Sequence, residues 1–322
     1  MRSIPIIDFS SNSEILSHEI MASGFVQLTN HGISSDLIDS VWHQCKEFFA
    51  LPLTEKRKLS RSLENVMGYY DRELTKEKRD QKEVFDFACV TYPDLPDDHP
   101  KNISTVDGVN QWPDGLLPQF QPTLKEYVDA CTDLAHRILE VFSTGLDLDG
   151  SYLRTFFDRD HTSFLRLNHY PVEDVLEPTQ QKRTVPLGDQ ALHHHTDAGV
   201  LTILLQDAVG GLQVNESKRW IDIEPIDGSL IINVGDLMQI WSNDRYKAAI
   251  HRVKPIKETD RYSIPFFFNP SYETICKPIV GSSEKPIYRP VKWGDFRARR
   301  AEGDFASYGE EIQISDFKIE PS

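Results

Sequence analysis

Residues 191–206 read ALHHHTDAGVLTILLQ, two short β-rich runs on either side of a turn. Runs of the same kind, separated by turn residues such as Gly and Asp, recur throughout residues 164–268. Many short strands at such spacing are typical of an antiparallel sandwich or barrel. The expected strands are Phe164–Tyr170, Ala191–Thr196, Leu201–Gln206, Leu212–Val214, Trp220–Ile223, Leu230–Val234, Leu237–Ile240, Ile250–Val253 and Tyr262–Phe268.

Outside this region, apolar residues recur at steps of three and four, which predicts helices. The expected helices cover residues 35–49, 54–63, 116–146 and 293–301. Ser34 or Ser35 is a candidate cap for the first of them, and residues 65–114 look irregular. The expected regions are a mostly helical one at 1–160, a β core at 161–275, and a C-terminal helix and tail at 276–322.

The charge balance of this 322-residue chain limits its partners. The 35 basic and 50 acidic residues give a net charge of −15, which argues against nucleic acid and anionic lipid, because phosphates bind clustered Lys and Arg. No apolar run approaches the ~18 residues of a membrane span, and the N-terminus lacks the apolar segment of a secretory signal. We therefore expect a cytoplasmic protein that binds small molecules and has no obligatory protein partner. Its four widely separated cysteines are expected to be reduced thiols.

The strongest chemical signal is the motif His195-Thr196-Asp197, which is followed by His251. Positions i and i+2 of a strand face the same side, so His195 and Asp197 are expected to point into one cavity. Two imidazoles and one carboxylate leave three positions of an octahedron open, which is what a non-haem Fe(II) oxygenase requires. An HxD motif by itself is weak support, since two polar residues at a strand end also produce it.

Two further pairs repeat the two-residue period. Arg261 and Ser263 could bind a carboxylate, through the guanidinium fork and a hydroxyl. A dicarboxylate that chelates a metal at one end needs such an anchor at the other. Asn168 and Tyr170 could face the same cavity. The alternatives are a surface cation for Arg261 and core packing for Tyr170.

In order and spacing, these motifs resemble the 2-oxoglutarate/Fe(II)-dependent dioxygenases, and more closely the branch that contains isopenicillin N synthase and the plant flavonoid and gibberellin oxidases. The core motifs are RLNHYP at 166–171, HTD at 195–197, GD at 235–236, HRV at 251–253 and RYSIPFFFNP at 261–270. The similar terminal segments are IPIIDF at 4–9, GFVQLTNHG at 24–32, GDF at 303–305 and IQISD at 312–316. The resemblance covers nearly the whole chain.

The resemblance implies a distorted double-stranded β-helix of the jelly-roll type, with an N-terminal helical region packed on it. The residues that it implies for Fe(II) are His195, Asp197 and His251. Those that it implies for 2-oxoglutarate are Arg261, Ser263, Asn168 and Tyr170. His169 stands where relatives commonly have a Tyr, and strand alternation predicts that it faces away from the cosubstrate.

The implied reaction consumes O₂ and 2-oxoglutarate, releases succinate and CO₂, and removes hydrogen from an unactivated C–H bond of a small metabolite, as in secondary metabolism. Hydroxylation, desaturation and oxidative ring closure all remain open as outcomes. An iron-dependent oxidase that uses no 2-oxoglutarate is an alternative within the class. A catalytically silent ligand-binding member and a zinc hydrolase on the same barrel are alternatives from other classes.

The substrate side of the cavity is less defined by the sequence. His193 shares a strand face with His195 and could line the pocket or donate a hydrogen bond near the iron. Arg166, Phe267 and Phe268 could form pocket walls, and Arg72 could meet an acidic substrate. The alternatives are a histidine without a role at the barrel mouth, core packing for the aromatic rings and a solvated charge for Arg72.

Overall fold

We describe a computed structural model of the chain. The structure describes residues 4–11, 13–62, 65–75, 77–90, 108–157, 160–306 and 312–320. Part of the segment expected to be irregular, residues 91–107, and part of the expected C-terminal tail, residues 307–311, lie outside these ranges. No helix among the described residues is long and apolar enough to cross a membrane.

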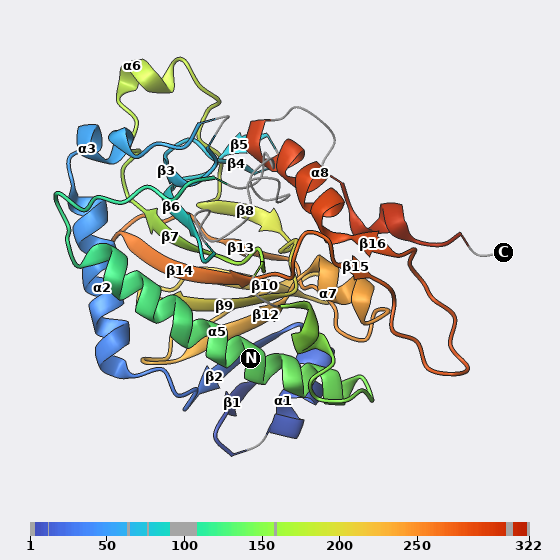
Figure 1. The fold of residues 1–322 in the computed structure, drawn as a ribbon. Helices are drawn as coiled ribbons and strands as arrows, with labels where there is room; N and C mark the ends of the chain where they lie inside the picture. Colours follow the sequence, from blue (N-terminus) through green and yellow to red (C-terminus); the bar gives the residue numbers. More distant parts are fainter. Residues whose placement is uncertain are drawn as a thin grey trace.

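Two β-sheets form the centre of the molecule (Figure 1). The larger sheet has the order β1-β2-β12-β9-β14-β7-β6-β3 and the smaller one the order β11-β10-β13-β8. The strands of the larger sheet are β1 (Ile6–Asp8), β2 (Phe25–Thr29), β3 (Gly68–Tyr70), β6 (Glu83–Ala88), β7 (Phe164–Tyr170), β9 (Leu201–Gln206), β12 (Leu230–Val234) and β14 (Arg261–Phe268). Those of the smaller sheet are β8 (Leu192–His195), β10 (Leu212–Glu216), β11 (Arg219–Asp222) and β13 (His251–Val253). Two short hairpins are β4 (Leu74–Thr75) with β5 (Lys78–Arg79), and β15 (Ile275–Cys276) with β16 (Val291–Lys292).

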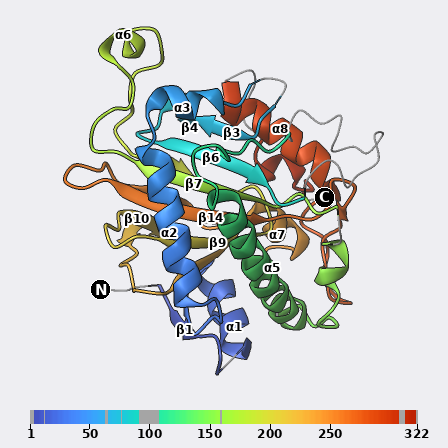
Figure 2. The same ribbon diagram turned by 60° about the vertical axis from the view of Figure 1, so that its left-hand side comes forward.

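Helices cover the outer face of the larger sheet, where α2 and α5 cross its strands (Figure 2). The helices are α1 (Ser13–Ser23), α2 (Ser35–Ala50), α3 (Leu53–Lys58), α5 (Phe120–Gly145), α6 (Pro178–Gln181), α7 (Asp236–Trp241) and α8 (Trp293–Ala306), with 3-10 turns η2 (Leu153–Phe156) and η3 (Ile314–Phe317). Ser34 caps α2 by accepting a hydrogen bond from the Leu37 amide at 3.2 Å. Phe48 of α2 packs against Phe85 and Phe120, at ring distances of 4.7 and 5.1 Å, and so joins both helices to the sheet.

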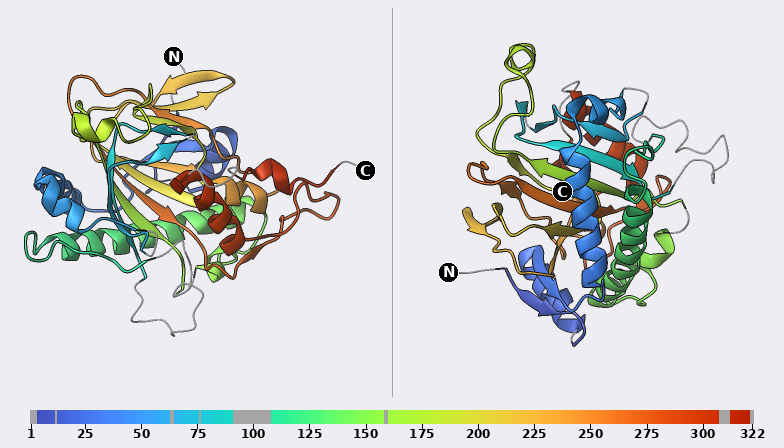
Figure 3. Two further views of the ribbon diagram at one scale, coloured as in Figure 1. Left: turned by 90° about the horizontal axis from the view of Figure 1, so that it is seen from above. Right: turned by 90° about the vertical axis from the view of Figure 1, so that its left-hand side faces the viewer.

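The N-terminal residues are continuous with the β core. Strand β1 pairs in parallel with β2, which pairs in turn with β12 of the core. Two more early strands, β6 and β3, extend the other edge of the same sheet beyond β7. The first 160 residues therefore supply both edges of the larger sheet as well as the helices that cover it. Helix α8 packs next to β4 beside the two sheets (Figure 3).

One expected strand is wrong, and several strands were missed, of which β6 is the longest. Residues Leu237–Ile240 form part of helix α7. This run is almost entirely buried, and a short buried apolar run does not distinguish strand from helix. Strand β6 lies in the segment expected to be irregular, although all six of its residues are buried. Its charged members Glu83 and Asp86 hid the pattern, and both are neutralised by ion pairs.

The cysteine prediction is confirmed. None of the four thiols forms a disulfide, and Cys45, Cys131 and Cys276 are buried while Cys89 is partly buried. Burial raises the pKa of the Cys45 thiol, which therefore stays protonated near neutral pH. The cysteines thus serve as small apolar side chains in the core.

Candidate active site

The smaller sheet brings three candidate metal ligands together. His195 ends β8 and His251 begins β13, and the two residues are directly paired across the strands. Asp197 follows two residues after His195. Its Oδ1 lies 3.7 Å from His195 Nε2 and 3.6 Å from His251 Nε2. The ligand atoms of these three residues lie within 4.8 Å of one another, a spacing that one metal ion can bridge.

Hydrogen bonds orient both imidazoles so that Nε2 is left as the ligand atom. His195 Nδ1 lies 2.8 Å from the His193 carbonyl, and His251 Nδ1 lies 3.1 Å from the Ala249 carbonyl. A carbonyl only accepts, so each Nδ1 donates and each Nε2 keeps its lone pair. Burial, together with the neighbouring His251, lowers the pKa of His195 to about 3, so the ring is neutral as metal binding requires.

The carboxylate is oriented in the same way. Asp197 Oδ2 accepts hydrogen bonds from Thr202 Oγ1 at 2.6 Å and from Asn233 Nδ2 at 2.7 Å. Oδ1 is thereby directed at the two imidazoles. Burial opposes ionisation of Asp197, but His251, His195 and the two hydrogen bonds outweigh it and lower the pKa of the carboxyl. The donor set is two imidazoles and one ionised carboxylate, which fits a non-haem Fe(II) site.

A buried cation that forms no ion pair with the described residues lies further into the cavity. Arg261 is only 1% exposed, yet it pairs with no carboxylate among the described residues. Its Nε donates to the Gly210 carbonyl at 2.6 Å and its Nη1 to Ser263 Oγ at 3.3 Å. The guanidinium carbon lies 4.8 Å from the centre of the Tyr170 ring. Asp207 interacts with Arg261 electrostatically without forming an ion pair, and because a buried cation with no ion-pair partner is costly, this arrangement favours binding of an anion.

Strand register explains why these residues meet. In the pairing of β14 with β7, Arg261 lies opposite Tyr170 and Ser263 lies opposite Asn168. Asn168 Nδ2 donates to Ser263 Oγ at 3.4 Å. His169, between them, faces the other side of the sheet as expected, where it contacts Glu83 at 2.7 Å. The sequence-predicted residues for 2-oxoglutarate therefore lie on one face, in directly paired positions.

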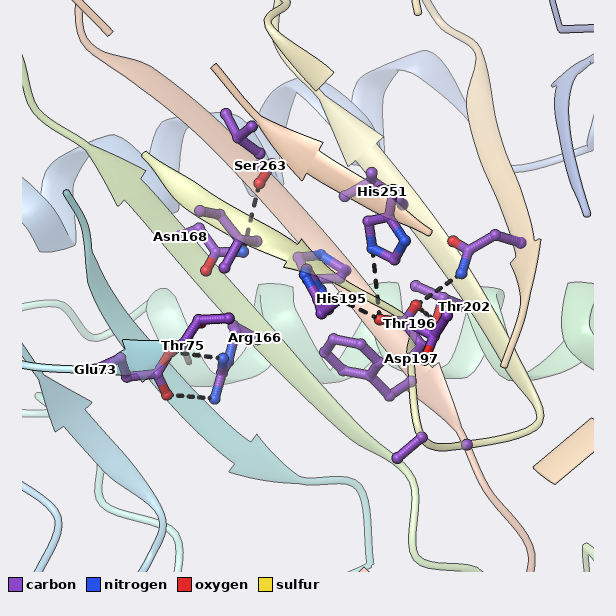
Figure 4. Close-up of a pocket in the computed structure, with 18 of the residues that line it drawn as sticks. Glu73, Thr75, Arg166, Asn168, His195, Thr196, Asp197, Thr202, His251 and Ser263 are labelled. Carbon is purple, nitrogen blue, oxygen red and sulfur yellow. Dashed lines mark hydrogen bonds and ion pairs between the residues drawn. The ribbon is translucent and has the colours of Figure 1, made fainter. Parts of the chain in front are cut away.

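The three candidate metal ligands line one cavity between the two sheets together with the residues predicted to bind 2-oxoglutarate, Arg261, Ser263, Asn168 and Tyr170 (Figure 4). The cavity has a volume of about 200 Å³, room for molecules of metabolite size. Figure 4 shows Asn168 and Ser263 on one side of the three candidate ligands and Arg166 with Glu73 on another. The predicted pocket residues Arg166 and Phe267 also line the cavity.

Arg166 belongs to a buried ion network at the cavity wall. Its guanidinium contacts Glu73 at 2.9 Å and Asp86 at 2.7 Å. Glu73 also pairs with Lys82 at 2.9 Å and with Arg61 at 2.8 Å. Burial alone would raise the pKa of Glu73, but Arg166, Lys82 and Arg61 lower it well below its usual range. The positive charge of Arg166 is therefore already neutralised within the protein.

Three of the candidate substrate residues, Phe268, Arg72 and His193, do not line the cavity. Phe268 faces away from the cavity and stacks on Phe157 at 4.4 Å, because alternate residues of β14 point to opposite faces. Arg72 is 40% exposed at its side chain, lies 3.6 Å from Asp71 and does not line the cavity. His193 is held between Asp80 and Asp189, each at 3.1 Å, outside the cavity lining.

The position of His193 follows from an irregularity in β8. His195 pairs with His251, but Leu192 pairs with Val253, so β8 has one more residue than β13 over this interval. Such a bulge breaks the alternation of faces. Leu192 and His195 therefore both line the cavity, although they are three residues apart.

Sequence reasoning missed several residues of the site. These are Thr202 and Asn233 beside Asp197, Glu73 and Lys82 in the cavity wall, and Arg297 and Arg300 of α8. Thr202 and Asn233 lie in strands that were expected, at directly paired positions of β9 and β12. Their two polar side chains within apolar strands were the available signal. The other four residues lie in segments far in sequence from the triad of candidate metal ligands, His195, Asp197 and His251. No local sequence pattern predicted that these segments reach the cavity.

Comparisons with known proteins are consistent with this geometry. Residues 161–270 match the family model of the 2OG-Fe(II) oxygenase superfamily. Residues 4–115 match the one described as non-haem dioxygenase in morphine synthesis N-terminal. A curated relative, the 2-oxoglutarate-Fe(II) type oxidoreductase hxnY of Emericella nidulans, is 35% identical over 284 residues, which cover 84% of this chain and 78% of that protein.

Solved structures of similar proteins contain the expected cosubstrate. A full-length Neurospora crassa protein in complex with alpha-KG and thymine has a TM-score of 0.75 and 27% identity, covering 92% of this chain and 96% of that chain. JOX2 in complex with 2OG, Fe and JA has a TM-score of 0.78 and 26% identity, covering 99% of this chain and 90% of that chain. These matches confirm the jelly-roll fold and the family resemblance. The chain belongs to the 2-oxoglutarate–Fe(II) oxygenase superfamily and is an oxidoreductase that uses Fe(II) and 2-oxoglutarate.

Proposed function

We propose that His195, Asp197 and His251 bind the Fe(II), and that Arg261 and Ser263 hold the distal carboxylate of 2-oxoglutarate. The observation that carries this proposal is the buried guanidinium of Arg261, which pairs with no carboxylate of the described chain and lines the same cavity as the triad. A dicarboxylate bound to the metal at one end would supply the missing negative charge at the other.

Asn168 and Tyr170 position the cosubstrate in this proposal. Asn168 is fixed by its hydrogen bond to Ser263, and the Tyr170 ring lies against the guanidinium of Arg261. When bound, Fe(II) would supply the oxidising chemistry with O₂ as the oxidant, so that 2-oxoglutarate is oxidised to succinate and CO₂ and hydrogen is removed from a C–H bond of the substrate. The chain itself binds and orients the reactants and keeps water out, since most of these side chains are buried.

The prime substrate is a small molecule that occupies the rest of the cavity. Two observations support this: the size of the cavity, and the thymine and JA named in the complexes of the two similar structures. Hydroxylation, desaturation and ring closure share these residues, so the geometry fits each outcome. The cytoplasmic location and the absence of an obligatory protein partner stay predictions.

An anaerobic titration tests the residue assignments. Purified protein receives Fe(II) and then 2-oxoglutarate, and the weak visible charge-transfer band of the chelated keto acid is recorded. Arg261→Ala should need about 10- to 100-fold more 2-oxoglutarate, because it loses charge-assisted hydrogen bonds of about 1.5–3 kcal/mol. The matched control is Arg219→Ala, which removes an exposed arginine of β11 and should titrate like the original protein.

The outcomes separate the proposal from its alternative. An unchanged titration of Arg261→Ala would show that another residue anchors the distal carboxylate. If Fe(II) binds to the original protein but 2-oxoglutarate produces no band, the oxidase that uses no cosubstrate becomes the better description. Measurement of succinate in aerobic turnover distinguishes these two cases independently of the band.

A further inference from the structure

One end of the cavity, away from Arg261, is apolar and aromatic. We call it the outer end and define it by Phe164, Phe267, Trp293 and Arg297, which all line the cavity. Phe164 and Phe267 are paired across β7 and β14, and their rings stack at 4.6 Å with an angle of 24°. Trp293 and Arg297 are four residues apart on α8 and so share one face of that helix.

Most cations that line the cavity are neutralised by the protein. Arg166 and Lys82 share Glu73, and Lys82 also lies 3.3 Å from Asp80. Arg300 of α8 pairs with Asp236 at 3.2 Å. The positive charges of these side chains are therefore balanced by carboxylates of the protein, and they do not require an anionic ligand.

Arg297 differs from these cations. Its guanidinium pairs with no carboxylate among the described residues and lies over the Phe164 ring, at 5.8 Å from the ring centre. The side chain is partly buried, so it is desolvated more than an ordinary surface arginine. A planar cation beside aromatic rings favours a ligand that combines a carboxylate with a flat apolar body.

The other end of the cavity, which contains Arg261 and Ser263, is called the inner end. Arg297 is too far from the inner end to bind the 2-oxoglutarate that we place there. Arg297 lies over Phe164, whose strand partner Phe267 is six residues along β14 from Arg261, which is roughly 20 Å at about 3.3 Å per residue. The cavity thus has two unneutralised arginines, one at each end. This local charge is opposite to the net charge of −15 of the chain, which otherwise repels anions.

We propose that the prime substrate is a small organic acid with a flat, apolar body. Its carboxylate binds Arg297, and its body lies against Phe164 and Phe267. This inference rests on the proposed function, because it assigns the outer end to the prime substrate only if the inner end holds 2-oxoglutarate. The arrangement would fix one end of the substrate on α8 and direct the other toward the metal site.

Binding of acids and their neutral amides tests this inference. Protein loaded anaerobically with Fe(II) and saturating 2-oxoglutarate is dialysed to equilibrium against benzoate, phenylacetate, benzamide or phenylacetamide. At least one acid should bind about tenfold or more tightly than its amide, the effect of one charge-assisted hydrogen bond. Saturating 2-oxoglutarate prevents the acids from binding at the inner end of the cavity.

Variants of α8 locate the interaction. Arg297→Ala should weaken binding of the preferred acid by about 10- to 100-fold and leave binding of its amide unchanged. Arg297→Lys should restore part of the affinity, since it keeps the charge but loses the planar fork. Arg299→Ala is the matched control, because it removes the same charge from the exposed side of the same helix.

Two results would overturn the inference. One is that no acid binds more tightly than its amide, and the other is that Arg297→Ala binds the acid as well as the original protein does. The charge-transfer titration with 2-oxoglutarate is run on the same samples. If it is normal while acid preference is absent, only this inference fails; if it is absent as well, the proposed function fails first.

Discussion

The inner end of the cavity and its outer end are assembled from different kinds of structure. At the inner end, Arg261, Ser263, Asn168 and Tyr170 occupy directly paired positions of two neighbouring strands. At the outer end, strand residues face α8, which lies more than a hundred residues from β7 in the chain. The inner end is therefore fixed by hydrogen-bonded register, whereas the outer end depends on how separate elements pack. In the proposed assignment, the cofactors bind where strand register fixes the side chains, and the substrate binds where packing between separate elements places them.

The largest effect is expected from Asp197→Ala, which changes one of the three proposed metal ligands. The variant loses the only carboxylate of the triad, so its affinity for Fe(II) should fall by more than about 100-fold, beyond the 10–100-fold typical of residues that merely hold a ligand. Anaerobic equilibrium dialysis with Fe(II) measures it. Asp295→Ala, at an exposed position of α8, is the control. Retention of the original affinity would mean that the metal is held elsewhere.

Phe268→Ala and Phe267→Ala compare the two faces of β14. Phe268 is fully buried against Phe157, so its truncation should cost about 3–5 kcal/mol of unfolding free energy while 2-oxoglutarate binding stays normal. Phe267 is partly exposed at the cavity, so Phe267→Ala should cost less. Urea unfolding measures both. Equal losses would contradict the assignment of Phe267 to the cavity face.

Glu73→Gln tests the ion network that supports the cavity wall. It leaves Arg166, Lys82 and Arg61 short of one buried carboxylate, which should cost about 3 kcal/mol or more in unfolding free energy. Glu55→Gln, which breaks an exposed pair with Lys58, should cost less than about 1 kcal/mol. If both variants lose the same amount, the network contributes no more than a surface pair.

The same network makes a prediction for acid stability. The three cations lower the pKa of Glu73 in the folded state below its ordinary value of 4.5. The stabilisation is therefore complete above that ordinary pKa and is lost as the pH falls through the lower folded value. Below pH 4.5, the free energy of unfolding of Glu73→Gln should decline less steeply than that of the original protein. Urea unfolding at a series of pH values measures the slope.

The smallest effect is expected from Thr202→Val. It removes one of two hydrogen bonds to Asp197 Oδ2 and leaves the one from Asn233. Fe(II) affinity should fall by about 10- to 100-fold, the usual effect of losing a residue that orients a ligand. Thr155→Val, at an exposed position, is the control. An unchanged affinity would show that Asn233 alone suffices to orient the carboxylate.

Residue spacing explains how much of the site was predictable. His195 with Asp197, and Arg261 with Ser263, lie two apart along the chain, and a strand of regular alternation brings such pairs to one face. The prediction failed where alternation is broken, as at His193 beside the bulge in β8. It also failed for Leu237–Ile240, whose burial on all sides removes the periodicity that separates helix from strand.

The remaining residues could not be placed from local pattern. Glu73 and Arg297 reach the cavity only after the hairpin of β4 and β5 and helix α8 have packed beside the sheets. Their positions depend on tertiary contacts between segments far apart in sequence. Strand β6 was hidden for a related reason, because its charged residues Glu83 and Asp86 are neutralised by partners from elsewhere in the chain.

The imidazoles of His195 and His251, which we propose as metal ligands, have a property that is useful in protein engineering. Each ring is oriented by a backbone carbonyl two residues earlier in its own segment, at His193 for His195 and at Ala249 for His251. Backbone carbonyls are present whatever the side chain, so ring orientation does not depend on the identity of a distant residue. Each histidine could therefore be transferred by design, together with the two residues before it, to another pair of adjacent strands. Asp197 cannot be transferred in this way, because the Thr202 and Asn233 side chains that orient it come from two other strands.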